Sequence, residues 1–242
     1  MESSSDPVDW FSGDLAERYD EFLGEWGDAD VVGTTADVLA ELAGGGAALE
    51  FGIGTGRVAL PLAERGVSVR GIDLSHDMVA QLRKKPGGDS IAVVIGDYAT
   101  TRVDGTFTLV YLVFNTINNQ TTQEAQAATF ANAAAHLVPG GCFVVEVGVP
   151  PREPLRVFDL SEAHVGVDEY DPVTQRLVSH HFTLVDGQWQ RGREIPFRAV
   201  SPAELDLMAH VTGMRLRERW SNWKREAFTR KSTRHVSVWE KT

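Results

Sequence analysis

A glycine-rich stretch near residue 50 has the residue types that bind a ligand through the backbone. It reads LEFGIGTGR from Leu49 to Arg57, with glycines at positions 52, 54 and 56. A dinucleotide-binding loop has a third, close-packing glycine where this chain has Arg57, and it holds a pyrophosphate at the start of a helix. Glu50 would place a carboxylate beside that charged group, which is repulsive at short range. The stretch therefore favours a ligand without a pyrophosphate.

A second acid ends the next apolar run, VSVRGID, where Asp73 can accept hydrogen bonds from two ribose hydroxyls. The glycines let the backbone approach a ligand closely, and Glu50 becomes favourable when that ligand carries positive charge. S-adenosylmethionine has a sulfonium, an ammonium and a ribose but no phosphate. These residues therefore predict S-adenosylmethionine as the cofactor.

Five motifs between Ala47 and Val149 follow one another as they do in a known family: LEFGIGTGR, GIDLS, GDYAT, LVFN and LVPGGCFVVE. In these motifs the chain resembles the class I S-adenosylmethionine-dependent methyltransferases of small-molecule type. The resemblance implies methyl transfer on a Rossmann-like fold. It also implies cofactor-binding residues by position: Glu50, Gly52 and Gly54 at the methionine end, Asp73 at the ribose, Leu74 and Met78 near the adenine, Asp97 at the adenine amino group with Tyr98 beside it, Phe114 where the fourth strand opens, and Tyr19 from an amino-terminal helix that shuts the pocket. For Asp73 and Asp97 the alternative is a helix cap or a solvated strand end.

The catalytic candidates depend on the acceptor, because a neutral amine needs alignment and water exclusion whereas a hydroxyl usually needs a general base. His180 and His181 are adjacent in an expected strand, so at most one can face the site. Asn119 follows the fourth expected strand, where some amino-sugar N-methyltransferases of antibiotic pathways have a histidine. It could orient a polar acceptor, cap the next helix or make a turn. Glu146, in the fifth expected strand, is a further candidate.

These residues need a scaffold that brings strand ends together, and the middle of the chain alternates strand and helix patterns. The apolar runs are ALEFG (48–52), VSVRGID (67–73), IAVVIGD (91–97), FTLVYLVF (107–114) and CFVVEVGV (142–149). Such runs, separated by helical stretches, predict a parallel sheet covered on both faces, with ligands at the carboxyl ends of the strands. We expect an α/β fold with a Rossmann-like, doubly wound, mostly parallel seven-stranded sheet, an antiparallel last strand and an inserted β-hairpin.

Four segments of one domain are expected from these patterns. They are an amino-terminal helical segment (1–34), the α/β core (35–149), an inserted antiparallel β segment (150–200), and a carboxy-terminal helix with the last strands (201–242). Asp186-Gly187 is the hairpin signal. Ser201 as N-cap, Pro202 at the first helical position and Glu204 as the partner in a capping box predict where the last helix begins.

An aromatic stripe precedes the core. Leu15, Tyr19, Phe22 and Trp26 recur at helical spacing, with Ser12 as the N-cap. The stripe either packs on the domain or forms a lid over a ligand, and the spacing alone leaves both interpretations open.

Composition limits the partners and the compartment. The chain has 34 acidic against 23 basic residues and a formal charge of −11, which argues against nucleic-acid and anionic-membrane partners. It has no apolar run long enough for a membrane helix and no signal-peptide pattern, and its single cysteine, Cys142, fits a reducing cytoplasm. No residues stand at metal-ligand spacing. The exposed edge of the hairpin favours a homodimer.

Three hypotheses follow. The first is a cytoplasmic methyltransferase acting on N or O of a small metabolite. Its expected partners are that small-molecule acceptor and a second copy of the chain. The second is a module that binds S-adenosylmethionine without catalysis. The third is an NAD-dependent oxidoreductase, against which both Glu50 and Arg57 count. The acceptor, the methylated atom and the use of a base are left open by the sequence.

Overall fold

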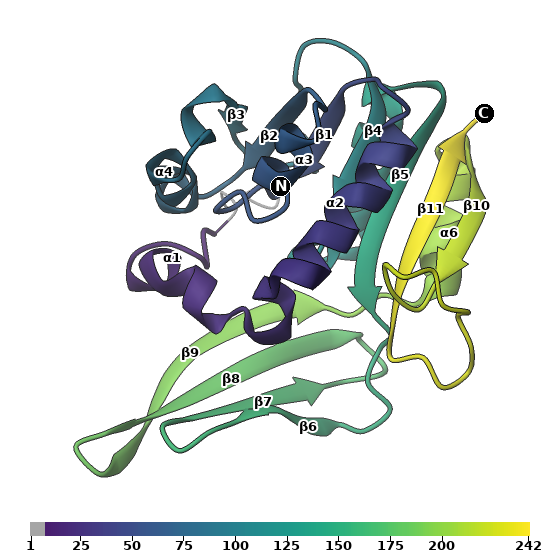
Figure 1. The fold of residues 1–242 in the computed structure, drawn as a ribbon. Helices are drawn as coiled ribbons and strands as arrows, with labels where there is room; N and C mark the ends of the chain where they lie inside the picture. Colours follow the sequence, from purple (N-terminus) through teal and green to yellow (C-terminus); the bar gives the residue numbers. More distant parts are fainter. Residues whose placement is uncertain (1–7) are drawn as a thin grey trace, which may run out of the picture.

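A computed structural model describes residues 8–242, apart from the side chain of Glu25. Its centre is a seven-stranded sheet with the order β10-β11-β5-β4-β1-β2-β3 (Figure 1). The strands are β1 (Ala48–Phe51), β2 (Val69–Asp73), β3 (Ala92–Ile95), β4 (Phe107–Leu112), β5 (Leu137–Gly148), β10 (Met214–Trp220) and β11 (Arg234–Lys241). β11 is antiparallel to both of its neighbours, and the remaining pairs from β3 to β5 are parallel. The expected fold class is confirmed.

Helices cover both faces of this sheet, as a doubly wound fold requires. They are α2 (Ala29–Ala43), α3 (Ala59–Glu64), α4 (His76–Lys84), α5 (Gln123–His136) and α6 (Pro202–Val211). One buried cluster joins the sheet to α2, α3 and α4 through Leu39, Leu62 and Leu82. A second joins it to α5 and α6 through Phe130 and Leu205. Among the described helices, none has the length and apolar character needed to cross a membrane.

Helix starts follow the expected chemistry, with one correction. Ser75, Thr122 and Ser201 each accept a hydrogen bond from a backbone N–H of the helix that follows, and Pro202 occupies the first turn of α6. The reciprocal half of the predicted capping box is absent from the described contacts. The Glu204 carboxylate instead accepts hydrogen bonds from other elements, because a buried arginine competes for it.

The inserted segment is larger than the expected hairpin. The hairpin of β8 (Arg176–Val185) and β9 (Gln188–Arg198) is present, and β6 (Leu155–Leu160) and β7 (His164–Tyr170) extend it to a four-stranded antiparallel sheet with the order β6-β7-β8-β9. This second sheet lies beyond the carboxyl ends of the central strands (Figure 1). Every residue of β6 is exposed. Its sequence, LRVFDL, alternates apolar and charged residues only over short stretches, and the register of its pairing with β7 shifts between Val157 and Asp159, so it gives a weak strand signal.

The amino-terminal segment, expected to be helical, is a chain of short helical pieces. It comprises α1 (Asp14–Arg18), η1 (Tyr19–Phe22) and η2 (Gly24–Gly27), and its N-cap is Gly13 rather than Ser12. Gly24, with a φ of 50°, interrupts helical geometry. Phe22 is 55% exposed, so the four aromatic and apolar residues do not share one buried face.

The predicted segment boundaries can be compared with the observed helices and strands. The boundary between residues 34 and 35 falls inside α2. Residues 1–7 of the expected 1–34 segment lie outside the described residues. The four strands of the insertion lie within the expected range 150–200.

Candidate active site

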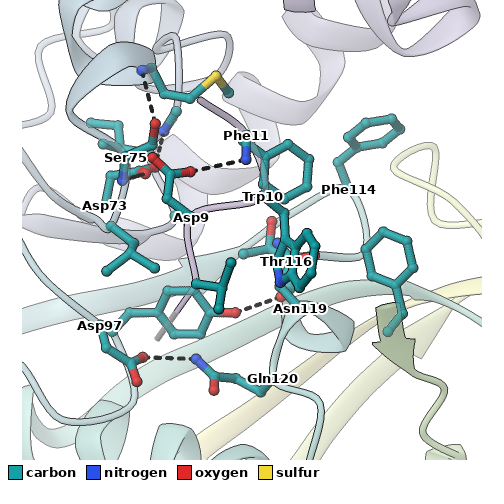
Figure 2. Close-up of a pocket in the computed structure, with 18 of the residues that line it drawn as sticks. Asp9, Trp10, Phe11, Asp73, Ser75, Asp97, Phe114, Thr116, Asn119 and Gln120 are labelled. Atoms are coloured by element: carbon teal, nitrogen blue, oxygen red, sulfur yellow. Dashed lines mark hydrogen bonds between the residues drawn. The ribbon is translucent and has the colours of Figure 1, made fainter. Parts of the chain in front are cut away.

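A cavity of about 710 Å³ lies at the carboxyl ends of β1, β2 and β4, within the size range of ligand sites. Its far side is formed by residues 8–11 and by residues of the second sheet. All ten residues expected to bind the cofactor line it: Tyr19, Glu50, Gly52, Gly54, Asp73, Leu74, Met78, Asp97, Tyr98 and Phe114. Figure 2 shows the acids at the strand ends and the aromatic side chains converging on this cavity.

Glu50 supplies a buried carboxyl at the end of β1. The Tyr111 hydroxyl donates to its Oε2 at 2.9 Å, and the residue is only 2% exposed. Burial raises the pKa of Glu50 to about 8, although the Tyr111 hydrogen bond and the Arg57 charge act in the opposite direction. A cation bound beside Glu50 would offset the cost of its ionisation.

Asp73 organises the glycine loop from the end of β2. Gly54 N–H donates to Asp73 Oδ2 at 2.6 Å, and Ser75 N–H donates to Oδ1 at 2.8 Å. Burial raises the pKa of this carboxyl, and the nearby charge of Asp9 adds to the effect. Gly52, with a φ of 72°, lies so close to Thr116 that a Cβ would sit 2.6 Å from its methyl group. The loop therefore keeps its backbone open to a ligand only with glycine at this position.

Asp97 and Tyr98 follow β3 and have different surroundings. The side-chain amide of Gln120 and the N–H of Ala99 both donate to Asp97 Oδ1 at 2.8 Å. Among the described contacts, Oδ2 of this carboxylate is left for a ligand. Tyr98 stacks on Phe51 with ring centroids 5.8 Å apart, and its hydroxyl donates to the Thr116 carbonyl at 2.6 Å. Its ring is thus as much a part of the core as of the cavity wall.

A strained turn follows β4 at the edge of the cavity. Phe114 and Asn115 both have left-handed backbone angles, with φ of 56° and 61°. Glu146 holds the turn, since its Oε2 accepts from the Phe114 N–H at 3.1 Å and its carbonyl accepts from the Asn115 N–H. Burial raises the pKa of Glu146. Two consecutive non-glycine residues in this region persist only where the surroundings fix them, and such strain clusters at ligand sites. Glu146 lies beneath this turn and does not line the cavity.

The amino-terminal segment is fastened to both sides of the cavity. Its Asp20 accepts from the Thr55 hydroxyl at 2.6 Å and pairs with Lys85 at 2.5 Å. On the other side, the Arg193 guanidinium of β9 donates to the carbonyls of Trp10 and Ser12 at 2.9 and 3.1 Å. This segment therefore bridges the core and the second sheet.

Arg57, the residue that departs from the dinucleotide pattern, also anchors this segment. Its guanidinium donates to the Trp26 carbonyl at 2.9 Å and lies 5.4 Å from the centre of the Phe114 ring. Trp26 in turn packs on Phe114, with ring centroids 5.1 Å apart. The side chain that would crowd a pyrophosphate thus joins the amino-terminal segment to the strained turn.

The catalytic candidates are separated by the structure. Asn119 lines the cavity, whereas His180 and His181 do not. His180 lies between the carboxylates of Glu169 and Glu194, with both contacts at 3.0 Å. His181 contacts a second histidine 3.1 Å away on β7. A catalytic role for either histidine stays a prediction, and its position outside the lining does not support it.

Several cavity residues had escaped the sequence interpretation. They are Val8, Asp9, Trp10 and Phe11 from the amino terminus, Gln120, Thr121 and Ala125 after β4, and Thr174, Arg176, Pro196 and Phe197 from the second sheet. Among these residues, the adjacent aromatic side chains of Trp10 and Phe11 were the feature of the sequence that could have indicated a binding site. Within residues 8–242, no group of three or more potential metal ligands is found.

Comparison with known proteins assigns the class. The family described as a methyltransferase domain matches residues 48–141. The solved structure of the CcbJ methyltransferase from Streptomyces caelestis is similar over nearly the whole chain, at 34% identity and a TM-score of 0.85, covering 94% of this chain and 96% of that one. The chain belongs to the S-adenosylmethionine-dependent methyltransferases, and S-adenosylmethionine is the cofactor of that family.

More distant relatives agree with this fold. CalS10, an amino pentose methyltransferase from Micromonospora echinaspora solved with S-adenosylmethionine bound, has a TM-score of 0.72 at 21% identity, covering 93% of this chain and 96% of that one. Phosphatidylethanolamine N-methyltransferase of Cereibacter sphaeroides is 43% identical over 67 residues, which is 28% of this chain and 31% of that one. The matches to curated relatives span about half of their length or less.

Proposed function

We propose that this protein transfers the methyl group of S-adenosylmethionine to a nitrogen or oxygen of a small metabolite, in specialised metabolism. The observation that carries the proposal is the division of one cavity between two sources. Acids at the ends of β1, β2 and β3 line one part, and residues from the amino terminus and the second sheet line the rest. A cavity built in this way has room for a cofactor and a small acceptor together.

The cofactor residues suit the chemical groups of S-adenosylmethionine. Glu50 would hold the ammonium at the methionine end, Asp73 the ribose hydroxyls, and the second oxygen of Asp97 the adenine amino group. The buried carboxyl of Glu50, with its pKa near 8, gains most from a cationic neighbour. The cofactor supplies an electrophilic methyl group on a sulfonium. The chain aligns the two partners and keeps water out, which can supply about 7–11 kcal/mol of the barrier.

A nitrogen acceptor is the better supported alternative. The described residues that line the cavity include no histidine, and a neutral amine needs no general base in the transfer step. Asn119 would orient the acceptor through its amide. Two structural neighbours support this choice by their printed names, CalS10 as an amino pentose methyltransferase and KedS8 from Streptoalloteichus as a sugar N-methyltransferase. An oxygen acceptor would need a base, for which His180 and His181 are poorly placed.

Calorimetry tests the cofactor first. S-adenosylmethionine and S-adenosylhomocysteine should bind, whereas NAD and NADP should give no heat. Labelled methyl transfer to a panel of small amines and phenols, read by mass shift, then separates an enzyme from a non-catalytic binding module. Tight NAD binding without S-adenosylmethionine binding would overturn the proposal in favour of the oxidoreductase.

A homodimer and a cytoplasmic location also stay proposals, as does the absence of nucleic-acid and membrane partners. For the dimer, the supporting feature is β6, an edge strand with exposed Leu155, Val157 and Leu160. Light scattering after size exclusion, with wild type compared with Val157→Lys, should show a dimer that the substitution weakens.

A further inference from the structure

The turn that enters β8 holds two cavity residues on either side of a strained one. Thr174 and Arg176 line the cavity, and Gln175 between them has a left-handed φ of 60°. A non-glycine residue keeps this conformation only where its surroundings fix it, and ligand clamps are one such place. Contacts from neighbouring elements must therefore hold Gln175 in this conformation.

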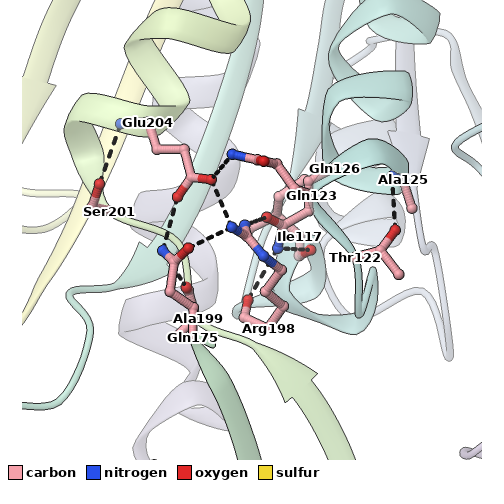
Figure 3. Close-up of polar contacts among 10 residues, drawn as sticks. All are labelled: Ile117, Thr122, Gln123, Ala125, Gln126, Gln175, Arg198, Ala199, Ser201 and Glu204. Carbon is pink, nitrogen blue, oxygen red and sulfur yellow. Dashed lines mark hydrogen bonds and ion pairs between the residues drawn. The ribbon is translucent and has the colours of Figure 1, made fainter. Parts of the chain in front are cut away.

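A polar network centred on the buried Arg198 holds Gln175 in place. The Arg198 guanidinium pairs with Glu204 of α6 at 2.7 Å and donates to the side-chain carbonyls of Gln175 and Gln126, both at 2.5 Å (Figure 3). The Gln175 amide in turn donates to Glu204 Oε2 at 2.9 Å. Arg198 is only 6% exposed. The network thus locks the turn onto α5 and α6, and this orients the two flanking residues toward the cavity.

The same network leaves one positive charge without a partner. Arg176 and Arg198 are directly opposite each other in the β8–β9 register, and like charges in that position are unfavourable. Glu204 neutralises Arg198, but among the described residues Arg176 has no ion pair. The cavity's other arginine, Arg57, is engaged with Trp26 and Phe114. Arg176 is exposed at the cavity, so its guanidinium is accessible to an anionic group on a ligand.

We propose that Arg176 binds a carboxylate of the methyl acceptor, an inference that rests on the proposed function. The part of the cavity at the strand ends is acidic, with Glu50, Asp73 and Asp97, so Arg176, on the second sheet, marks the acceptor part. One guanidinium balances one carboxylate, which it can bind through two parallel hydrogen bonds. A phosphate ester carries about −1.5 to −2 charges, and the second arginine in the described lining, Arg57, is already engaged with Trp26. The acceptor is therefore an amine that also carries a carboxylate.

Three amino sugars that differ only at carbon 6 test this assignment. They are D-glucosamine, 2-amino-2-deoxy-D-glucuronic acid and D-glucosamine 6-phosphate, which present a hydroxymethyl, a carboxylate and a phosphate. Each is titrated calorimetrically into protein saturated with S-adenosylhomocysteine, and each is assayed for labelled methyl transfer. The carboxylate sugar should bind at least about tenfold more tightly than glucosamine, because a hydrogen bond to a charged group is worth that much or more.

Variants of Arg176 test whether this residue causes the preference for the carboxylate sugar. Arg176→Gln should abolish the preference for the carboxylate sugar over glucosamine, and Arg176→Lys should retain part of that preference. Arg215→Gln is the matched control, since Arg215 is an exposed arginine on β10 paired with Glu240. S-adenosylhomocysteine affinity should be the same in all four proteins.

The outcomes separate the two proposals. If S-adenosylhomocysteine fails to bind wild type, the proposed function itself is wrong. If it binds but the carboxylate preference is absent, or survives Arg176→Gln, only the role of Arg176 is overturned. If the phosphate sugar binds more tightly than the carboxylate sugar, the assignment of a carboxylate-bearing acceptor is overturned. The acceptor would then carry a phosphate.

Discussion

The two parts of the cavity are held together by different kinds of contact. The cofactor part comes from strand ends between β1 and β4, where backbone N–H groups bind buried acids such as Asp73. The part proposed to bind the acceptor joins residues 8–11, the turn after β4 and the second sheet. Side chains such as Arg193 and Arg198 connect these elements. The difference shows that the first part follows from the sheet itself, whereas the second depends on a few long-range polar contacts.

Removing Arg198 should have the largest effect and should separate the two parts. Arg198→Ala removes the ion-pair partner of Glu204 and leaves the side-chain carbonyls of Gln126 and Gln175 without their donor. Each buried acceptor left unsatisfied costs about 1–3 kcal/mol of unfolding free energy, measured by urea denaturation. The folded fraction should still bind S-adenosylhomocysteine, whereas acceptor turnover should be lost. Arg18→Ala is the control, because both side chains of the Arg18–Glu21 pair are exposed and the loss should cost less than about 1 kcal/mol. Equal loss of cofactor affinity would show that the two parts are not separable.

A substitution of Asp73 tests the part of the cavity formed by the strand ends. Asp73→Ala removes the proposed acceptor for the ribose hydroxyls, which should cost about 1.5–3 kcal/mol of binding. Calorimetry should therefore show S-adenosylhomocysteine affinity falling about tenfold or more. Stability should fall as well, because the N–H groups of Gly54 and Ser75 lose their partner. Asp73→Asn, which keeps one oxygen, should lie between. Unchanged affinity in Asp73→Ala would contradict the assignment of Asp73 to the ribose.

The pH dependence should also arise in the cofactor part. The pKa of Glu50 is about 8 in the folded protein against 4.5 for the free group, so the folded chain retains a proton that the unfolded chain releases. Its contribution to stability is full below pH 4.5 and is lost as pH rises through 8. Affinity for cationic S-adenosylmethionine should change in the opposite sense, rising about tenfold between pH 7 and 9 as Glu50 ionises. Glu50→Gln should flatten both curves, and a wild-type affinity independent of pH would exclude Glu50 as the partner of the cation.

Arg193 should have the smallest effect, confined to closure over the cavity. Arg193→Ala removes two hydrogen bonds to the Trp10 and Ser12 carbonyls, each worth about 0.5–1.5 kcal/mol. Proteolysis near the amino terminus should be a few-fold faster than in wild type and should slow when S-adenosylhomocysteine is added. Arg191→Ala, which alters a neighbouring exposed arginine of the same hairpin, is the control.

The two interpretations of the amino-terminal segment then diverge under deletion. A lid predicts that removing residues 1–27 abolishes turnover and leaves the melting temperature nearly unchanged. Packing predicts a lower melting temperature with or without ligand, and cleavage that S-adenosylhomocysteine does not slow. The contacts of Asp20 with Thr55 and Lys85 join this segment to the core, so the melting temperature of the deletion variant measures how much they stabilise the fold.

The sequence alone determined the central sheet and the placement around one cavity of the residues expected to bind the cofactor. Apolar runs, glycines and the acids that end each strand are local signals. In a parallel sheet the carboxyl ends of the strands must meet at one edge. Glu50, Asp73 and Asp97 were therefore brought together by the same pattern that predicted the fold.

Only the tertiary structure decided the rest of the site. β6 has no buried face, Phe114 adopts its left-handed turn because Glu146 holds it, and Arg176 reaches the cavity because Arg198 locks the preceding turn. His180 and His181 showed the reverse, since their chemistry suggested catalysis while the register of β8 put them outside the cavity. These placements depend on contacts between residues far apart in the chain, and hydrophobic periodicity carries no information about such pairs.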